Sequence, residues 1–376
     1  MRRIAPLFSM AIIGFVVLLA PLAHGAEAKA PWQEEWEKTV QAAKKDGQLA
    51  IYGVNGYDEV FKAFARTFPE IKVSFLGGLG SQLGPRIMNE RRAEKYLVDI
   101  YLAGIVTPYT VFHRGKALDP IRPVLALPEV LDESKWWSGR HHYADPEGQY
   151  IFVFQGNVHG GETAYNTQLF DPREIRSYWD FLNPKWRGKI VARDPKAVST
   201  VAHSLRFFYN HPEIGPDFIR RFFGDMDLAL SRDERQMTDW LGAGKFPLAF
   251  FIAGVEEGEK QGLPVKMFEP GRFKEGASVG PTQGSVSLIN RAPHPNAAKV
   301  AINWLLSRDG QTAYQNGFAQ TDDVIESMRE DIPKDIIPAP HRRVKGAKYV
   351  YSGRPEWIDM APVQKLVNEA LGQTQK

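Results

Sequence analysis

The sequence has 376 residues and a nearly balanced charge, with 47 lysines and arginines against 44 aspartates and glutamates. Without Arg2 and Arg3 the formal charge of +3 falls by two, to +1, which excludes the strong positive charge expected of a nucleic-acid-binding protein. There is no cysteine, so disulfides, thiolate metal sites and cysteine nucleophiles are excluded as well. A chain of this length predicts two domains of about 100–200 residues each.

Residues 1–25 have the three-part pattern of a secretory signal peptide. Arg2 and Arg3 give a positive start, the apolar stretch is densest at 10–20, and 23–25 (AHG) offers small residues to a signal peptidase. The alternative is a retained membrane anchor, since the apolar run is close to the ~18–20 residues that span a bilayer. Pro21 and the small residues after it favour cleavage, so the sequence predicts an exported protein.

After the leader, strand and helix patterns alternate. Residues 32–45 and 58–67 have helical periodicity, and so does the stretch of about 81–95 that follows a glycine-rich loop. The buried-strand patterns of this part lie at 48–54 (QLAIYGV), 71–76 (IKVSFL) and 98–102 (VDIYL). Strands that alternate with helices at this spacing predict a parallel sheet with crossover helices.

A second α/β segment follows residues 119–150, which are rich in proline and predicted to run as surface loops. Its strands are expected at 189–192, 227–230 and 247–252 (PLAFFI), and its helices at 199–209, 217–223 and 231–241. Further strands are expected at 150–154, 265–268 and 285–289, with a strongly patterned helix at 297–306. Elements near residue 280 could rejoin the first unit, although periodicity does not decide this.

Six loops follow predicted strands with small, polar or glycine-rich residues. In open α/β sheets, ligands bind beyond the C-terminal ends of the strands, where helix N-termini present free N–H groups. The alternative is that these are ordinary turns and helix caps. From these strand ends and two neighbouring positions we predict a binding set: Tyr52, Asn55, Gly78, Ser81, Gln82, Gly104, Tyr165, Arg193, Asp194, Ser199, Thr200, Arg232 and Thr282.

The known catalytic motifs for nucleotide, serine-hydrolase and zinc-peptidase chemistry are absent from the sequence. His159 and Glu162 have an H-x-x-E spacing, and His141 and His142 lie just before Asp145. Both sets contain metal-ligand types, but no further partner stands at a telling spacing. The interpretation we prefer is solvated or capping histidines, with no metal site, no cofactor and no enzymatic activity.

Several stretches, in order, resemble the extracellular solute-binding proteins of bacterial ABC importers, in the ferric-iron and polyamine branch. The most specific is 292–299 (APHPNAAK), followed by 302–307 (INWLLS) and the dipeptide Gly310-Gln311. The weaker matches are 165–170 (YNTQLF), 179–190 (WDFLNPKWRGKI) and 240–248 (WLGAGKFPL). The resemblance covers essentially the whole chain after the leader.

The resemblance implies the type II periplasmic binding protein fold, in which two α/β lobes are joined by two hinge strands over a ligand cleft. It implies that 29–164 and 281–376 form the first lobe and that 165–280 form the second. It also implies a monomeric periplasmic receptor that closes on a small solute and presents it to the permease of an importer, without chemistry. With no cysteine for a lipid anchor, such a receptor would diffuse freely in the periplasm.

The absence of the tyrosines that bind iron in this family narrows the class of solute that we expect. Ferric binders of this family hold iron with adjacent tyrosines after the strand that corresponds to 247–252, and here residues 253–256 are Ala-Gly-Val-Glu. We therefore expect a polar or anionic organic solute of phosphonate, organophosphate or carboxylate type, with Arg193 or Arg232 as a bidentate partner. Ferric iron is the alternative within the family. A secreted enzyme and a sensor input protein are the alternatives outside it, and only a thin aromatic and acidic set at Tyr52, Tyr57 and Asp58 would suit a polyamine.

Overall fold

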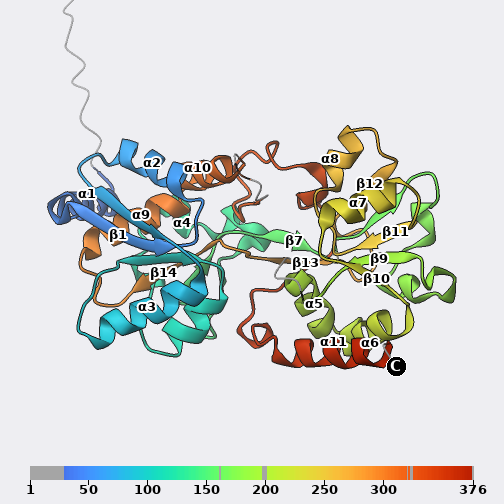
Figure 1. The fold of residues 1–376 in the computed structure, drawn as a ribbon. Helices are drawn as coiled ribbons and strands as arrows, with labels where there is room; N and C mark the ends of the chain where they lie inside the picture. Colours follow the sequence, from blue (N-terminus) through green and yellow to red (C-terminus); the bar gives the residue numbers. More distant parts are fainter. Residues whose placement is uncertain (1–28, 161, 197–200, 320, 322–324, 375–376) are drawn as a thin grey trace, which may run out of the picture.

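The computed structural model describes residues 29–160, 162–196, 201–319, 321 and 325–374. The chain forms two α/β lobes that lie side by side and are joined by a narrow waist (Figure 1). This confirms the predicted two-lobed α/β architecture. The signal-peptide prediction lies outside the described residues. Among the helices that the structure describes, none combines the length and the apolar character needed to cross a bilayer.

Lobe 1 is built on a mixed sheet with the strand order β2-β1-β3-β14-β6-β5, and β4 pairs with β14. The pairs of β1 with β2 and with β3 are parallel, as predicted, whereas β14 runs antiparallel to both of its main neighbours, β3 and β6. Its strands are β1 (Gln48–Gly53), β2 (Lys72–Gly77), β3 (Ile100–Ala103), β4 (Leu118–Asp119), β5 (His142–Tyr143), β6 (Ile151–Val153) and β14 (Ser285–Ile289). Its α-helices are α1 (Pro31–Asp46), α2 (Asp58–Thr67), α3 (Gly80–Arg92), α4 (Pro128–Leu131), α9 (Pro295–Leu306) and α10 (Arg308–Phe318).

Lobe 2 is built on a sheet with the order β10-β9-β11-β8-β12. Its strands are β8 (Ala164–Asn166), β9 (Ile190–Arg193), β10 (Ala229–Ser231), β11 (Leu248–Phe250) and β12 (Val265–Met267). The helices around it are α5 (Val201–Asn210), α6 (Gly215–Asp225), α7 (Glu234–Gly242), α8 (Val255–Lys260) and α11 (Ala361–Thr374). Its core is rich in phenylalanine, and Phe222 and Phe250 have ring centroids 4.6 Å apart.

Three strands connect the lobes, where the family resemblance implies two. They are β7 (Asn157–His159), β13 (Ala277–Gly280) and β15 (Tyr349–Tyr351), in the order β15-β13-β7. Strand β13 is antiparallel to β7 and parallel to β15. Figure 1 shows β7 and β13 running through the waist. The extra hydrogen-bonded strand ties the C-terminal part of the chain to the connection.

The last helix corrects the expected domain division, which assigned all of 281–376 to the first lobe. Strand β14 and helices α9 and α10 do pack in lobe 1, but α11 packs against α6 in lobe 2 (Figure 1). The reason is an apolar stripe at Val363, Leu366, Val367 and Ala370, whose helical spacing needs an apolar partner. The buried phenylalanine face of α6 supplies that partner.

One local prediction is also corrected by burial. Residues 119–150 include short helices and strands, and Trp136 is only 1% exposed, so this segment is part of the lobe 1 core. The side chain of Arg343 is also buried, and it pairs with Glu326 at 3.2 Å and with Glu330 at 2.9 Å. Opposite charges on the preceding segment make that burial possible.

Candidate ligand-binding cleft

A cavity of about 510 Å³ lies where both lobes meet the connecting strands. Its walls come from β7, from the start of α8 in lobe 2, from the β13–β14 turn and from the segment around residue 340. The lining residues are Asn157, Val158, His159, Glu162, His203, Ala253, Gly254, Glu256, Glu257, Lys260, Thr282, Gln283, Pro338 and His341. A volume of this size suits a small molecule.

The lobe 1 wall is shaped by one buried amide side chain. The Oε1 atom of Gln155 accepts hydrogen bonds from the backbone N–H groups of Thr282, Gln283 and Gly284, at 3.1, 2.8 and 2.7 Å. Its Nε2 atom donates to Thr282 Oγ1 at 2.7 Å. Gln155 is fully buried, so it fixes the β13–β14 turn against the cavity and leaves that turn uncharged.

A histidine–carboxylate pair lies where β7 and α5 border the cavity. His159, on β7, has its Nδ1 atom 2.9 Å from Glu162 Oε1. The other carboxylate oxygen of Glu162 accepts from the hydroxyl of Ser204, on α5. His203, from the same helix, stacks on the His159 ring with centroids 4.7 Å apart. Burial is the main cause that holds the pKa of His203 well below its ordinary value, so His203 is neutral at pH 7.

The part of the wall formed by α8 and by the segment around residue 340 carries the other charged groups. His341 Nε2 lies 2.7 Å from Glu256 Oε1, which joins the segment around residue 340 to α8 of lobe 2. Burial is the largest single influence on the pKa of Glu256 and raises it, but the hydrogen bond and charge of His341, a backbone hydrogen bond and the charge of Lys260 together outweigh burial, so the pKa lies below its ordinary value. Glu257 accepts from Gln261 at 3.1 Å and lies 3.7 Å from the Lys260 ammonium. Each lining carboxylate thus has a partner on the wall.

Of the thirteen predicted binding residues, Thr282 lines this cavity. Gly104, just after β3, does not line the cavity but packs against the backbone of Thr282, since a Cβ at Gly104 would be 2.4 Å from the Thr282 carbonyl oxygen. Four others lie at the ends of β1 and β2, as predicted, and are partly or fully exposed: Asn55, Gly78, Ser81 and Gln82. Helix α3 begins there without a side-chain cap, which leaves its first N–H groups available to an anion.

The two predicted tyrosines do not line the cavity. Tyr52 is buried in lobe 1, its hydroxyl donates to Glu90 at 3.2 Å, and Arg86 covers its ring. Tyr165 is buried in the core of lobe 2 beside Phe268, with ring centroids 4.8 Å apart. Both residues are on strands, and on a strand successive side chains point to opposite faces. Position at a strand end therefore did not decide their direction.

The two predicted arginines are engaged elsewhere on lobe 2. Arg193 pairs with Glu234, and the Arg232 guanidinium donates to Asp194 at 2.8 Å. The Arg232 side chain is 71% exposed. None of these residues lines the described cavity, so the predicted role of Arg193 and Arg232 as anion partners there is corrected. Ser199 and Thr200 lie outside the described residues.

The sequence contained signals for the residues that were missed. The H-x-x-E spacing of His159 and Glu162 predicts solvated or capping residues, but both side chains are largely buried and line the cavity. Residues 253–256 lack the adjacent tyrosines of the ferric binders, yet Ala253, Gly254 and Glu256 line the cavity. His203 and His341 gave no signal, because their neighbours in the cavity are distant in sequence.

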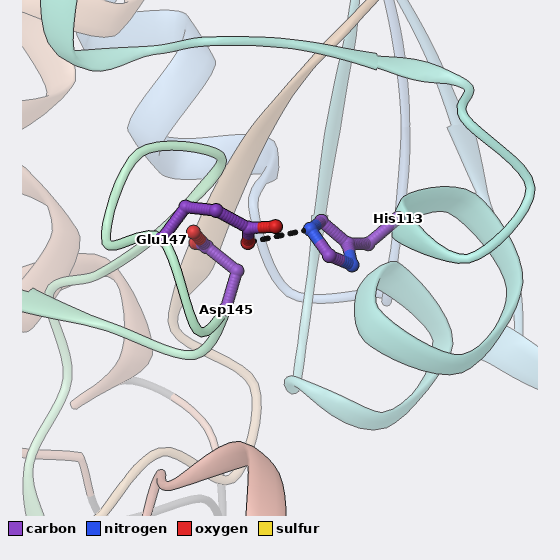
Figure 2. Close-up of side chains that lie close together, drawn as sticks. All are labelled: His113, Asp145 and Glu147. Carbon is purple, nitrogen blue, oxygen red and sulfur yellow. Dashed lines mark hydrogen bonds and ion pairs between the residues drawn. The ribbon is translucent and has the colours of Figure 1, made fainter.

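A second histidine–carboxylate pair lies outside the cleft. His113, at the end of the π-helix Pro108–His113, has Nε2 2.9 Å from Glu147 Oε2, and Asp145 lies beside them (Figure 2). The three side chains place ligand-type atoms within 4.8 Å of one another. However, the Asp145 oxygens already accept from the N–H groups of 149, 150 and 151 at 2.8–3.0 Å. The Asp145 carboxylate therefore stabilises the loop that follows it.

No family model matches the chain. A Haemophilus influenzae protein described as uncharacterized is 21% identical over 284 residues, which is 72% of this chain and 76% of its own. Iron-bound HitA from Pseudomonas aeruginosa is similar in structure, with a TM-score of 0.58, 17% identity, and coverage of 86% of this chain and 99% of HitA. A Bordetella ferric binding protein has a TM-score of 0.63 and 16% identity over 86% of this chain and 98% of its own.

The periplasmic binding protein AfuA from Actinobacillus pleuropneumoniae, with fructose-6-phosphate bound, has a TM-score of 0.54. It is 17% identical and covers 88% of this chain and 99% of its own. The chain has the fold of the two-lobed periplasmic binding proteins. In a periplasmic-binding-protein fold, a cavity with walls from both lobes can be closed by hinge motion, since a ligand there contacts both lobes together.

Proposed function

We propose that the protein is the periplasmic solute receptor of an ABC importer, and that the described cavity holds the solute. The observation that carries this proposal is a cavity lined by both lobes and by a connecting strand within this fold. Closure on the solute would make a compact form that the permease recognises, and no bond is made or broken. The signal-peptide pattern of residues 1–25 supports export.

We propose a small polar organic anion, of phosphonate, organophosphate or carboxylate type, as the solute. The lining carboxylates do not oppose an anion strongly, because each is already partnered on the wall. Lys260 lines the cavity and supplies a positive charge. The structural similarity to AfuA with fructose-6-phosphate bound is consistent with this class.

Ferric iron is a second candidate, favoured by one observation. Two imidazole–carboxylate pairs, His159 with Glu162 and His341 with Glu256, face the same cavity. These are nitrogen and oxygen donors that iron accepts. Two similar structures are an iron-bound protein and a ferric binding protein, although the adjacent tyrosines of the family pattern are absent from residues 253–256.

A thermal-shift experiment separates these candidates. Ligand-stripped protein is tested with fructose-6-phosphate, citrate, a phosphonate, inorganic phosphate and ferric citrate. A solute at about 100 times its dissociation constant should add about 2.7 kcal/mol to the free energy of unfolding. We expect organic anions to raise the melting temperature. A shift with ferric citrate but not citrate would replace the organic anion by iron, and turnover of any compound would overturn the receptor proposal.

A pull-down tests the partner and the assembly state. We propose a monomeric receptor that binds the transmembrane permease of its importer in the solute-bound form. Size-exclusion chromatography should give a monomer, and the permease encoded beside this protein should be retained more strongly when the solute is present. Retention of a sensor receptor instead of a permease would assign the protein to signalling.

A further inference from the structure

His159 occupies an unusual position for an ionisable side chain. It lies on β7, one of the strands that connect the lobes, and β7 is paired with β13. Its backbone carbonyl also accepts from the hydroxyl of Ser278 at 3.0 Å. The residue is only 4% exposed, yet it lines the cavity. The imidazole is therefore held rigidly where β7 borders the cavity.

Glu162 fixes which ring nitrogen of His159 carries the proton. As a carboxylate it can only accept hydrogen bonds. It lies 2.9 Å from His159 Nδ1, and its second oxygen is occupied by the Ser204 hydroxyl. Nδ1 is therefore the donor, which in the neutral imidazole leaves Nε2 with a lone pair.

Among the residues that the structure describes, the buried Nε2 atom of His159 has no hydrogen-bond partner. The stacked ring of His203 covers one face of the imidazole but lies parallel to it, at an interplanar angle of 16°, so it does not donate in the plane of Nε2. Buried polar atoms without a partner are uncommon in folded proteins and call for an explanation.

We propose that Nε2 of His159 accepts a hydrogen bond from a hydroxyl group of the solute, and that Glu162 positions the ring for this contact. The inference rests on the proposed receptor function and narrows its solute to a hydroxylated organic anion, such as a sugar phosphate or a hydroxy acid. The cavity has room for either molecule, since its volume of about 510 Å³ exceeds that of each. His159 is then a specificity residue, because an analogue without the hydroxyl leaves Nε2 unpartnered.

The test uses matched pairs of probes and matched variants. Citrate is compared with tricarballylate, which is citrate without its hydroxyl, and fructose-6-phosphate is compared with the methyl phosphate dianion, which carries no hydroxyl. His159→Asn keeps an amide near Glu162 but has no atom at the Nε2 position, whereas His159→Gln places an amide there. His113→Asn is the control, because His113 makes the same kind of pair with Glu147, also at 2.9 Å, outside the cleft (Figure 2).

Calorimetry should show that His159→Asn weakens the hydroxylated probe of each pair by about tenfold and leaves the other within about twofold. His159→Gln should restore part of the loss, and His113→Asn should change neither. Histidine ¹⁵N NMR of the free protein should show Nδ1 protonated and Nε2 unprotonated for His159. The Nε2 resonance should move when a hydroxylated probe binds, and Glu162→Gln should mix the two tautomers.

Three outcomes would overturn the inference. Unchanged affinity of folded His159→Asn for citrate and fructose-6-phosphate removes the contact, while the receptor function stands. A response of the His159 resonance to ferric citrate alone replaces the hydroxyl by iron. If none of the four probes binds the native protein, the proposed solute class fails and this inference fails with it.

Discussion

The two lobes line the cavity with different chemistry. Lobe 1 contributes the β13–β14 turn, whose residues Thr282 and Gln283 are uncharged and held by the buried amide of Gln155. Lobe 2 contributes side chains that can carry charge, among them Glu256 and Lys260. A solute between them would meet fixed, neutral hydrogen-bonding groups on one side and titratable groups on the other.

This difference indicates that the two lobes have different roles in binding. Backbone groups and amides keep their polarity at every pH, so the lobe 1 wall can fix the orientation of a solute. The charged wall of lobe 2 sets which net charge is accepted, and its ion pairs can respond to pH or exchange partners. The following four predictions test this contrast, starting with the largest expected effect.

Removing the side chain that supports the uncharged lobe 1 wall should lower the free energy of unfolding more than any other change considered. In Gln155→Ala, three backbone N–H groups lose their acceptor, at about 1–3 kcal/mol for each donor left buried. We expect the free energy of unfolding to fall by about 3–6 kcal/mol in urea denaturation, and solute binding to weaken as the turn loosens. Gln168→Ala, at an exposed position, is the control and should stay within about 0.5 kcal/mol. A loss under about 1 kcal/mol for Gln155→Ala would mean that water replaces its oxygen.

The attachment of the last helix to lobe 2 should be the next largest effect. Leu366 on α11 packs into the phenylalanine core, so Leu366→Ala should lower the free energy of unfolding by about 2–4 kcal/mol. Hydrogen exchange should rise in α6 and leave the lobe 1 strands unchanged. Lys365→Ala, on the exposed face, is the control. Faster exchange in lobe 1 instead would return α11 to the domain division expected from the sequence.

The bridge between α8 and the segment around residue 340 should contribute less. His341→Asn removes the partner that holds the pKa of Glu256 below its ordinary 4.5. A carboxyl whose folded pKa is depressed stabilises the fold above its unfolded pKa, and that contribution disappears as the pH falls through the folded value. We expect a loss of about 1–2 kcal/mol at neutral pH, shrinking below pH 4.5. A loss that does not change between these conditions would rule out the carboxylate as its cause.

Arg232→Ala should have the smallest effect. If Arg232 made a charged hydrogen bond to an anionic solute, as expected from the sequence, its removal would weaken binding by ~1.5–3 kcal/mol. Its exposed pair with Asp194 predicts instead a stability change below about 1 kcal/mol and unchanged affinity in calorimetry. A tenfold weaker solute would show that Arg232 leaves Asp194 and enters the cleft on closure.

The fold was largely accessible from local patterns. The strands at 48–54 and 285–289 and the helices at 58–67 and 297–306 all form near their predicted positions. Buried strands and amphipathic helices have short periods, which one stretch of sequence reveals. The site was less accessible, because Thr282 is the one residue that lines the cavity among those predicted residues that the structure describes. Strand ends were identified correctly, but the direction of side chains such as Tyr52 depends on register.

The sequence by itself determined the alternating α/β elements, the absence of cysteine chemistry and the near-neutral charge of residues 26–376. Only the tertiary structure decided that α11 joins lobe 2, that Arg193 and Arg232 are paired on that lobe, and that His159 faces a cavity with an unpartnered nitrogen. The physical reason is the distance along the sequence over which each kind of signal acts. Periodicity reports on neighbours within a few residues, whereas the partners of the cleft residues are brought together by two chain crossings between the lobes and by a third connecting strand.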